Sequence, residues 1–429
     1  MAVLATVVVC LTLVYTLVLF GLSRRRHPPP GSVPPALFFV FVVPCRNEEI
    51  VIGQTLDRLL ASKVAGFDGF AVLVVDDGSD DATAAIAKAV GDPRIWILSR
   101  RLPEARQGKG HALNAAYRHL RDSDLLAGRE LSDVVVCVLD ADGRLQPNAL
   151  YEVAPYFNDP RAGAVQVGVR MYNAGENRLA RLQDVEFVTF TEIFQRGRQL
   201  IGSVGLGGNG QFARLTALMD LGDAPWTDFL TEDLDLGIRL LIHGWTNNFC
   251  PRTHVNQQAV TSLRRLLRQR IRWFQGHLQC WARLPGILRS DLAVTTTVDL
   301  VQHLLSPALL LLLSIPVAGF YLAVVLGLVL APHQLRIALF TGNGVPFVLL
   351  YMLTFGLAPI YAYSYWLRDR EIRFIRALGL AHLYTLYTYL WIPAGWWAVV
   401  RIVFGRRGWA KTARTIDVVD ADAPLPGRS

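Results

Sequence analysis

Three acidic clusters precede an aromatic and basic motif in this chain. The clusters are Asp76-Asp77, Asp140-Ala141-Asp142 and Glu232-Asp233, and the motif is Gln269-Arg270-Ile271-Arg272-Trp273. Carboxylates can accept a hydrogen bond from a nucleotide base, bind a divalent cation or accept a proton from a hydroxyl. An arginine fork suits diphosphate oxygens, and tryptophan offers a flat face to a sugar ring. The four groups together therefore indicate chemistry on a sugar nucleotide.

The first cluster follows the apolar run 70–75 and precedes Gly78. At such a strand end, Asp76 or Asp77 could accept a hydrogen bond from a nucleotide base. Ser79 and Asp80 precede a helical pattern, so this segment could instead cap a helix. Binding of a base and capping of a helix are compatible roles. The segment 44–49 follows the preceding apolar run in the same way. It could line the same pocket or form a simple strand-to-helix turn, and the sequence does not choose between these roles.

Asp140 and Asp142 alternate after the apolar run 134–139. Oxygen ligands of this kind suit Mg²⁺ or Mn²⁺, and magnesium often takes one or two carboxylates plus substrate phosphates. The alternative is a turn acid before Gly143. In a chain that also carries the first cluster, we favour a metal held by Asp140 and Asp142.

Lys109 lies between Gly108 and Gly110, which suggests a phosphate loop. That motif needs a glycine where Pro103 stands and a serine or threonine where Gly110 stands, so it is excluded. A lysine between glycines can still approach a diphosphate. A solvated loop lysine is the alternative, and the sequence does not choose between them.

Thr231-Glu232-Asp233 precedes a helical pattern over 234–242. Acids at a helix start can simply complement the helix dipole. If Asp233 faces the anomeric carbon of a donor, it can instead act as general base. The loop 205–210 just ahead could bring Gly208 and Asn209 close to a sugar, or could be a plain turn.

Residues 263–278 form a basic amphipathic pattern with Leu263, Leu267 and Ile271 on one face, and such a helix can lie in a membrane interface. Gln269, Arg272 and Trp273 fall within about one turn of it. Alone, they would suit lipid head groups and an interfacial anchor; after three acidic clusters, a substrate role is favoured. Residues 184–200 form either a second interface helix or a core helix. The histidines at 111, 243, 254 and 277 show no metal-ligand spacing.

Apolar runs alternate with helical patterns between residues 38 and 142. Strands are expected at 38–43, 70–75, 94–98 and 134–139, and helices at 48–61, 82–90 and 110–120. Such alternation predicts βαβ units and a parallel sheet, whose ligands bind beyond the carboxyl ends of the strands. The first two acidic clusters fall at such ends.

The composition indicates a mixed membrane and catalytic architecture. The chain of 429 residues is 52% hydrophobic and 18% charged, with a net charge of +8. Residues 2–22 form a charge-free run followed by arginines, which places the next segment in the cytoplasm. Apolar blocks at 300–330, 347–367 and 377–404 predict three more spans. Four spans would put the C-terminus outside, against the charge of Arg406 and Arg407, and this conflict stays open.

Other bulk features narrow the class of protein. The basic residues crowd beside apolar segments without an aromatic-basic RNA signature, so nucleic acid is not expected as a partner. Five scattered cysteines fit a reducing compartment. The expected organisation is a membrane helix at 1–23, a linker at 24–36, a catalytic α/β domain at 37–260, amphipathic helices at 261–295, a membrane region at 296–405 and a tail at 406–429.

The four motifs, in this order, resemble those of the membrane-integrated, inverting glycosyltransferases of family 2, which include cellulose, chitin, hyaluronan and poly-N-acetylglucosamine synthases. The resemblance covers roughly residues 40–285. It implies a GT-A fold plus transmembrane helices, and a cytoplasmic active site at the cell membrane. It implies that Asp76, Asp77, Lys109, Asp140 and Arg272 bind a UDP-sugar donor and that Asp233 is the base. It further assigns the metal, Mg²⁺ or Mn²⁺, to Asp140 and Asp142, and the acceptor to Gly208, Asn209, Gln269 and Trp273.

The expected activity is processive transfer of a hexose or N-acetylhexosamine to a β-linked polysaccharide. Membrane lipids are expected partners, and an accessory subunit is a candidate partner for export. A single transfer to a lipid acceptor, as in ceramide glucosyltransferases, is the alternative. The loop Gly208-Asn209-Gly210-Gln211 departs from the pattern of cellulose and hyaluronan synthases, and only one apolar run precedes the domain. A non-catalytic scaffold or transporter is disfavoured because every expected acid is present.

Overall fold

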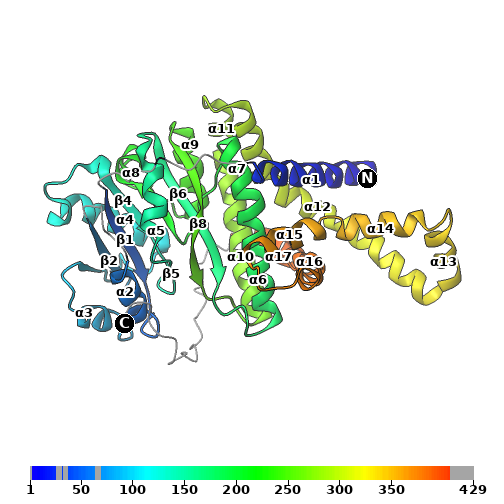
Figure 1. Cartoon of the computed structure of the whole chain (residues 1–429), viewed down its shortest axis with the longest axis horizontal. Helices are drawn as coiled ribbons and strands as arrows, with labels where there is room; N and C mark the ends of the chain where they lie inside the picture. The colour runs from blue at the N-terminus through cyan, green and yellow to red at the C-terminus, as the bar shows by residue number, and fades with distance from the viewer. Residues whose placement is uncertain (1, 26–30, 32–36, 63–68, 406–429) are drawn as a thin grey trace.

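The computed structural model describes residues 2–25, 31, 37–62 and 69–405 (Figure 1). Most of the expected proline-rich linker and the basic tail after residue 405 lie outside these residues. Figure 1 shows a body built on a sheet, with a group of helices extending from one side of it. The apolar helices, which come from both ends of the chain, gather on that side.

One eight-stranded sheet forms the centre of the body, in the order β3-β2-β1-β4-β7-β6-β8-β5. Its strands are β1 (Phe38–Cys45), β2 (Gly69–Asp76), β3 (Ile95–Ser99), β4 (Val134–Val138), β5 (Arg144–Leu145), β6 (Ala162–Met171), β7 (Gln211–Arg214) and β8 (Thr246–Gln257). The four expected strands, β1 to β4, are confirmed and are mutually parallel where they pair.

The predicted parallel pairing is thus confirmed for these four strands, but the sheet as a whole is mixed. Strand β7 runs antiparallel to both β4 and β6, and β5 runs antiparallel to β8. The second half of the sheet was not visible in the sequence because its strands carry polar residues. Strand β8, for example, contains Asn247, Asn248, Arg252 and His254, so no apolar run marks it.

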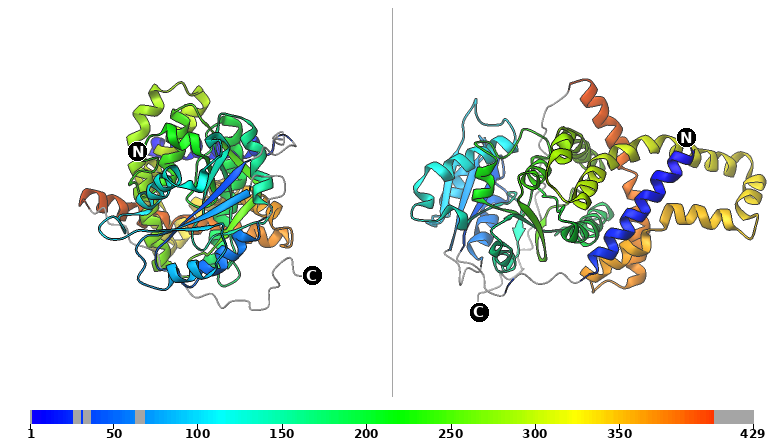
Figure 2. Two further views of the ribbon diagram at one scale, coloured as in Figure 1. Left: turned by 90° about the vertical axis from the view of Figure 1, so that its left-hand side faces the viewer. Right: turned by 90° about the horizontal axis from the view of Figure 1, so that it is seen from above.

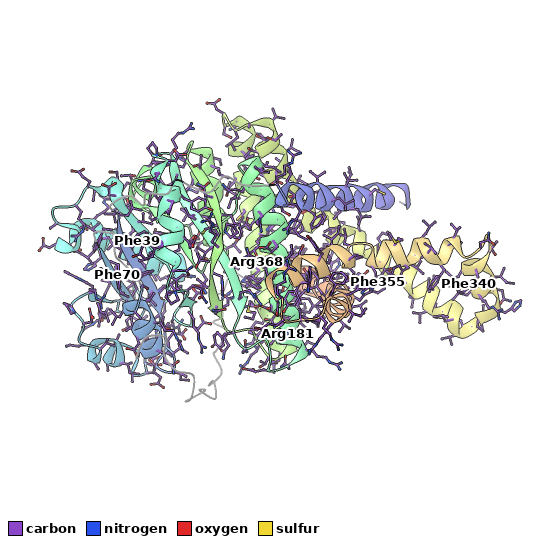
Figure 3. All side chains as sticks on the ribbon, in the orientation of Figure 1. Phe39, Phe70, Arg181, Phe340, Phe355 and Arg368 are labelled. Atoms are coloured by element: carbon purple, nitrogen blue, oxygen red, sulfur yellow. The ribbon has the colours of Figure 1, made fainter. Side chains whose placement is uncertain are left out.

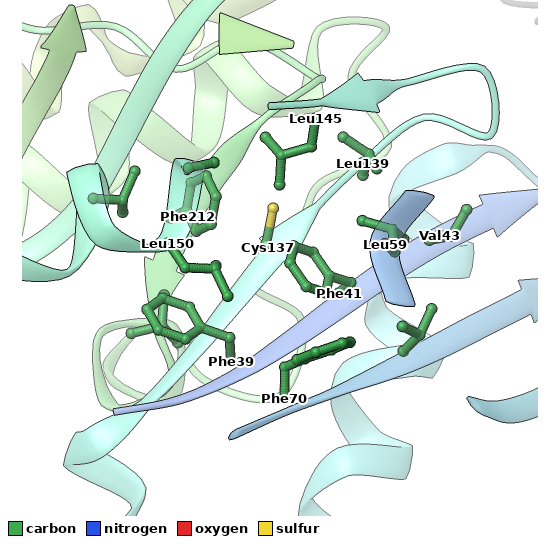
Figure 4. Close-up of a cluster of buried hydrophobic side chains, with 14 of the residues drawn as sticks. Phe39, Phe41, Val43, Leu59, Phe70, Cys137, Leu139, Leu145, Leu150 and Phe212 are labelled. Atoms are coloured by element: carbon green, nitrogen blue, oxygen red, sulfur yellow. The ribbon is translucent and has the colours of Figure 1, made fainter. Parts of the chain in front are cut away.

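Helices cover both faces of the sheet. They are α2 (Ile52–Leu60), α3 (Thr83–Ala89), α4 (Lys109–Asp122), α5 (Ala149–Val153), α8 (Leu215–Asp220) and α9 (Glu232–Ile242). Alternate residues of β1 enter two different cores: Phe39 and Phe41 pack with Leu59 in one (Figure 4), while Val40 and Val42 pack on the opposite face. Burial on both faces explains why this strand reads as an unbroken apolar run.

A long helical segment lies between the sheet and the apolar helices. It consists of α6 (Arg178–Thr189), a π-helical stretch (Phe190–Gln195) and α7 (Arg196–Ile201). Val185 and Val188 are buried against α15 (Ala358–Arg368) and α16 (Phe374–Thr388). Of the two alternatives left open for this segment, the structure therefore favours a core helix.

The remaining helices belong to the apolar part. They are α1 (Ala2–Ser23), α10 (Leu263–Gln279), α11 (Leu284–Arg289), α12 (Val294–Leu330), α13 (Pro332–Phe340), α14 (Val345–Phe355) and α17 (Trp391–Val403). Among the described residues, two helical segments, Val294–Leu330 and Val345–Arg368, are long and apolar enough to cross a membrane by length and composition. Figure 2 shows α12, α13 and α14 reaching away from the sheet as a hairpin.

The third apolar block of the tail differs from the expected continuous span. It is divided into α16 and α17 at Tyr389 and Leu390, and α17 packs against α10 rather than continuing the direction of α16. Its Gly395 lies so close to Phe274 of α10 that an added Cβ would meet the ring at 3.0 Å. The C-terminal end of the described chain is thus tied to the helix that carries the Gln-Arg-Ile-Arg-Trp motif.

Candidate active site

Lys109, the first residue of α4, lies where several predicted site residues meet. Its Nζ is 2.6 Å from Asp140 Oδ1, 2.7 Å from the carbonyl oxygen of Gly208 and 3.8 Å from Glu232 Oε1. Three segments far apart in the sequence therefore converge on the ammonium group of Lys109. A solvated loop lysine would not be enclosed in this way, so the geometry favours the alternative, an approach to a diphosphate, which stays a prediction.

A pair of hydrogen bonds holds α4 beside the segment that leads to α9. The Asn114 side chain donates to the carbonyl of Trp226 at 2.6 Å and accepts from the amide of Trp226 at 3.0 Å. Both groups are buried, so leaving either unpaired would cost about 1–3 kcal/mol. Asn114 therefore fixes the distance between Lys109 and the start of α9.

Asp233 lies in the first turn of α9, facing the glycine loop. Its Oδ1 accepts from the amide of Leu234 at 2.8 Å. A Cβ added at Gly208 would lie 3.1 Å from Asp233 Oδ2 and 3.1 Å from Lys109 Nζ. Any side chain at position 208 would therefore press between the two groups, which explains the glycine there. The structure places this loop beside Asp233 and Lys109, which favours the first of the two alternatives left open for it.

The electrostatics of the site favour proton acceptance near neutral pH. Burial raises the pKa of Glu232 to about 7, although Lys109 and Arg272 lower it in part. Burial also raises the pKa of Asp233, and Lys109 again opposes the shift. A general base works best when its pKa lies near the operating pH. Burial moves the pKa of the Asp233 carboxyl upward, toward that condition.

Strand β8 and Asn209 hold the second acidic cluster in place. Asn209 accepts from the amide of Asp140 at 3.2 Å and donates to Gln257 Oε1 at 3.0 Å. Asp142 is buried, and its Oδ2 accepts from the amide of Gln258 at 3.2 Å. Asn209, which the sequence assigned to the acceptor, thus makes its hydrogen bonds to the backbone and side chain that position Asp140.

The first acidic cluster lies at the same edge of the sheet, at the end of β2. Strand β1 separates β2 from β4, so the two clusters are about two strand spacings, or ~10 Å, apart. Asp76 accepts from the amide of Ser79 at 3.0 Å, and Asp77 pairs with Arg100. The strand-end position is as expected. The expected helix cap is not found, because α3 begins at Thr83 and its N-cap residue, Ala82, makes no side-chain cap hydrogen bond.

Helix α10 is pressed directly onto the start of α9. A Cβ added at Gly276 would lie 2.6 Å from the amide nitrogen of Thr231. On the next turn, Gln279 accepts from the amide of Leu230 at 2.9 Å, and Cys280 Sγ lies 3.6 Å from Thr231 Oγ1. This docking places Arg272 close enough to Glu232 to lower the pKa of that carboxyl.

Trp273 points to a different side of α10. Its ring meets Phe187 of α6 edge to face at 6.1 Å, and the Arg270 guanidinium lies 4.4 Å from the ring centre. Gln269 is half-buried one turn earlier on the same helix. Among the contacts of the described residues, none joins Trp273 or Gln269 to Asp233. Trp273, which shares the Arg270 guanidinium with the Trp391 ring of α17, lies at the seam between the catalytic domain and the apolar helices.

The structure adds a buried charge to the predicted faces of α10. Leu263, on the expected apolar face, is 49% exposed, whereas Arg270, which the pattern did not single out, is 2% exposed and is the largest fully buried side chain described. Arg270 pairs with Glu186 and donates to Tyr387 at 3.0 Å. The sequence pattern could not identify this residue, because an arginine is expected on the exposed face of a helix unless its buried partners are known.

A proline in α12 anchors the other end of α10. Pro307 has no N–H to donate to the carbonyl of His303, four residues earlier. His277 Nε2 of α10 lies 3.0 Å from that carbonyl oxygen, and Trp281 donates to the carbonyl of Leu304 at 2.7 Å. His277 therefore has a structural role, in line with the absence of metal-ligand spacing.

A family model described as "Glycosyltransferase like family 2" matches residues 34–276, which is more than half of the chain. The chain belongs to this family. The matched region contains the whole converging site, from Asp76 to Trp273. The expected family is therefore confirmed, and the four motifs that indicated it all lie inside the match.

The curated relatives of this family 2 glycosyltransferase include lipid and polysaccharide enzymes. The chain is 35% identical over 242 residues to a beta-monoglucosyldiacylglycerol synthase of Synechocystis, covering 56% of this chain and 47% of that one. It is 32% identical over 305 residues to the enzyme of the same description in Trichormus variabilis, covering 68% and 60%. It is 29% identical over 239 residues to a poly-beta-1,6-N-acetyl-D-glucosamine synthase of Staphylococcus aureus, covering 55% and 53%.

These alignments span about half to three-fifths of the relatives' own lengths. Among solved structures, the mannosyltransferase PcManGT of Pyrobaculum calidifontis, in complex with GDP-Man and Mn²⁺, superposes with a TM-score of 0.59 at 19% identity. The match covers 90% of this chain and 99% of that one. At this identity the likeness shows the fold alone, and it confirms the expected GT-A architecture with its mixed sheet.

The donor set of this family 2 site fits a divalent cation that substrate phosphates help to hold. Asp140 and Asp142 offer hard oxygen ligands on one short loop, which Asn209 and Gln258 fix. Within the described residues, no group of three or more metal-ligating side chains comes together. A site of one or two carboxylates completed by a diphosphate is the mode that magnesium commonly uses.

Replacing Gly276 by alanine tests the docking of α10 onto α9. Helix propensity alone would favour alanine by about 1 kcal/mol. The added Cβ would meet a backbone nitrogen at 2.6 Å, and such overpacking costs about 1–3 kcal/mol. We expect a net loss of stability and a fall in turnover of up to about 100-fold, because Arg272 moves away from the start of α9.

The control for this variant is Gly379→Ala in α16, where an added Cβ meets nothing within 4 Å. Thermal unfolding and initial rates of sugar transfer should be measured for both variants. Gly379→Ala should keep or raise stability and leave the rate unchanged. Equal stability and rate in the two variants would mean that the close contact at Gly276 does not position the site.

Proposed function

We propose that this family 2 glycosyltransferase transfers a hexose, most simply glucose, from a UDP-sugar to the free hydroxyl of a diacylglycerol-type membrane lipid, with inversion at the anomeric carbon. One observation carries the proposal. Arg272 and Trp273 are neighbours on α10, and the first lies near Glu232 while the second packs on Phe187 at the seam with the apolar helices. Two consecutive residues of α10 thus face the proposed donor site and the apolar helices, respectively.

The surroundings of the seam suit an acceptor that arrives from a membrane. Helix α10 packs against α12 and α17 as well as against α9. Nearby apolar side chains are exposed, among them Leu263 at the start of α10 and Val294 and Val298 at the start of α12, which are 78% and 61% exposed. Exposed apolar patches of this kind mark membrane or partner surfaces. A lipid hydroxyl held at the interface would reach the site without leaving the bilayer.

The relatives favour the same acceptor. The alignment with the Trichormus variabilis enzyme covers 68% of this chain and therefore extends beyond the family match, whereas the alignment with the poly-N-acetylglucosamine synthase covers 55%. The description of the former enzyme names a glucosylated diacylglycerol. We infer that the similarity outside the family match includes residues that contact the acceptor or the membrane.

The mechanism follows from the residues around Lys109. Asp233 takes the proton from the acceptor hydroxyl, whose oxygen attacks the anomeric carbon from the face opposite the diphosphate. As that C–O bond forms, the bond between the anomeric carbon and the diphosphate oxygen breaks, and its electron pair leaves with UDP. Lys109 and Arg272 stabilise the negative charge that develops on the leaving group. Asp140 and Asp142 would hold a divalent cation, which would supply further charge neutralisation there.

The remaining assignments extend this proposal. Asp77, with Asp76 shaping its turn, binds the uracil, and Gly208 leaves space for the transferred sugar. Gln269 and Trp273 contact the acceptor from the seam. We assign the membrane spans to α1, α12 and α14 with α15, and we place α16 and α17 at the membrane surface. Three spans put the residues after α17 on the same side as the catalytic domain, the cytoplasm, which agrees with the basic charge of Arg406 and Arg407.

Processive synthesis of a polysaccharide is the second candidate, because a poly-beta-1,6-N-acetyl-D-glucosamine synthase is among the relatives. Polymer export needs a path bounded by helices or an accessory export subunit. In the described part of the chain, α12, α13 and α14 instead project away from the site as a hairpin (Figure 2). This arrangement makes the lipid acceptor the better-supported proposal.

A product assay distinguishes the candidates. Purified full-length protein should be incubated with diacylglycerol-containing vesicles, Mg²⁺ or Mn²⁺ and, separately, UDP-glucose, UDP-galactose and UDP-N-acetylglucosamine. We expect one glycolipid bearing a single hexose, identified by thin-layer chromatography and mass spectrometry. A ladder of saccharides would replace the lipid proposal by the polymer proposal. The absence of transfer and of UDP release with every donor would overturn both.

A further inference from the structure

Three arginines from three different helices surround one buried carboxylate, Glu192. Arg24 follows the last residue of α1 and donates to the Glu192 carbonyl at 2.8 Å and to Oε2 at 3.3 Å. Arg196 of α7 lies 2.9 Å from the same Oε2, and Arg368, the last residue of α15, pairs with Oε1. The Glu192 side chain is only 2% exposed.

This cluster carries more positive charge than its carboxylate can neutralise. Three guanidinium groups on one carboxylate leave an excess of two positive charges in a partly buried place, and the pKa of Arg24 is lowered by burial and by Arg196. The Nε of Arg196 is buried and has no hydrogen-bond partner among the described residues. The three arginine side chains are 24–35% exposed, so the excess positive charge lies in an accessible place, and its geometry suits an anion.

The position of the cluster indicates where the anion comes from. Helices α1 and α15 are apolar and far apart in the sequence, yet both end on Glu192. Figure 2 shows the C-terminal end of α1 beside the α15–α16 pair, and Figure 3 labels Arg368 at the junction of the catalytic body with the C-terminal helices. Aromatic rings flank the junction: Phe20 of α1 meets Tyr363 of α15 edge to face at 6.1 Å. Basic and aromatic residues at the ends of apolar helices mark the head-group level of a bilayer.

We propose that Arg24, Arg196 and Arg368 form a binding site for the phosphate group of an anionic membrane phospholipid. The guanidinium groups present forked donors, which suit phosphate oxygens better than a single ammonium group does. A bound phosphate would neutralise the excess charge and would join α1, α7 and α15 through one ligand. Because Glu192 lies in the helical segment that continues α6, the lipid would also tie the membrane helices to the platform that packs on Trp273. The site is separate from the acceptor seam and does not depend on the proposed activity.

The test compares two double variants that remove the same charge. Arg24→Gln with Arg368→Gln removes two of the three guanidinium groups. Arg94→Gln with Arg121→Gln removes two arginines that pair with Asp92 and Asp223 on the catalytic domain, away from the cluster. Full-length protein should be titrated with vesicles of phosphatidylcholine, with or without phosphatidylglycerol. The readout is vesicle co-flotation together with the number of lipids retained in native mass spectrometry.

We expect affinity for phosphatidylglycerol to fall at least about tenfold in the cluster variant and to change less than about twofold in the control, since basic residues at an anionic surface act locally. Equal losses in the two variants would show that net charge alone is responsible and would overturn the site. Glu192→Gln should change the affinity in the opposite direction, because it increases the excess of positive charge. Phosphatidylglycerol should bind this variant more tightly and should raise its Tm more than that of the wild type.

Inorganic phosphate distinguishes the source of the anion. If millimolar phosphate raises the Tm of the wild type as much as phosphatidylglycerol does, the site binds free phosphate and the lipid assignment fails. Should the double variant be unfolded, Arg24→Gln alone decides, because Arg24 lies beyond the end of α1 and its side chain is 24% exposed. An unchanged phosphatidylglycerol affinity in that variant would count against the proposal.

Discussion

Replacing Asp233 by asparagine is expected to reduce sugar transfer by roughly 10³-fold while leaving UDP binding nearly unchanged, because a positioned general base contributes about 10²–10⁴-fold. The amide has nearly the same shape as the carboxylate and still accepts a hydrogen bond from Leu234, but it cannot take the acceptor proton. Lys109 keeps its partners at Asp140 and Gly208, so the donor side of the site is preserved.

The experiment should pair single-turnover rates with calorimetric titration of UDP. Asp220→Asn is a matched control: Asp220 accepts from the indole of Trp245 at 3.1 Å on the surface and lies outside the site. The control should transfer sugar at the normal rate. If Asp233→Asn does so as well, Asp233 is not the base. If it loses UDP binding together with activity, its role is to organise the site rather than to accept a proton.

The residues of the site were predictable because their positions follow from simple strands. Strands β1, β2 and β4 are buried on both faces, so each gives an apolar run that ends where the chain turns. Asp76 ends β2, and Asp140 follows β4 by two residues. Parallel strands bring their carboxyl ends to one edge, so the shared location of these acids could be inferred without coordinates.

The parts that were not predictable depend on contacts between distant segments. The approach of α10 to Thr231 rests on the missing side chain of Gly276, and a glycine inside a helical pattern does not reveal what lies against it. Asn209 looked like a loop residue near an acceptor until its hydrogen bonds to Asp140 and Gln257 placed it. The break between α16 and α17 is likewise set by packing on α10, whereas composition alone favours one continuous apolar helix.

Arg270 is the clearest case of a residue whose role appears only in three dimensions. Its guanidinium lies between the rings of Trp273 and Trp391, 4.4 and 5.0 Å from their centres. It pairs with Glu186, which also accepts from Tyr387 at 2.9 Å. One side chain thus connects the part of α10 that carries Trp273 with α6, α16 and α17. We expect Arg270 to be a positioning residue for Trp273 and Arg272.

Replacing Arg270 by methionine should therefore lower the free energy of unfolding by about 3–5 kcal/mol, because it leaves the Glu186 carboxylate without its buried partner. Trp273 would also lose the cation that holds its ring. For the folded fraction we expect a higher KM for the acceptor and a lower kcat, with UDP affinity close to normal. Arg270→Lys should keep the charge but not the planar stack, and should recover stability more fully than acceptor affinity.

A double variant separates the lost ion pair from the lost positioning. Glu186→Gln keeps an acceptor for Tyr387 and removes the charge, so Arg270→Met combined with Glu186→Gln leaves no unpaired ion in the buried cluster. The double variant should then recover a large part of the lost free energy of unfolding, because replacing a whole buried ion pair is often close to neutral. The raised acceptor KM should persist, because nothing restores the contact with Trp273. If KM returns with stability, Arg270 acts only through the fold, and the link between the C-terminal helices and the acceptor side of the site is absent.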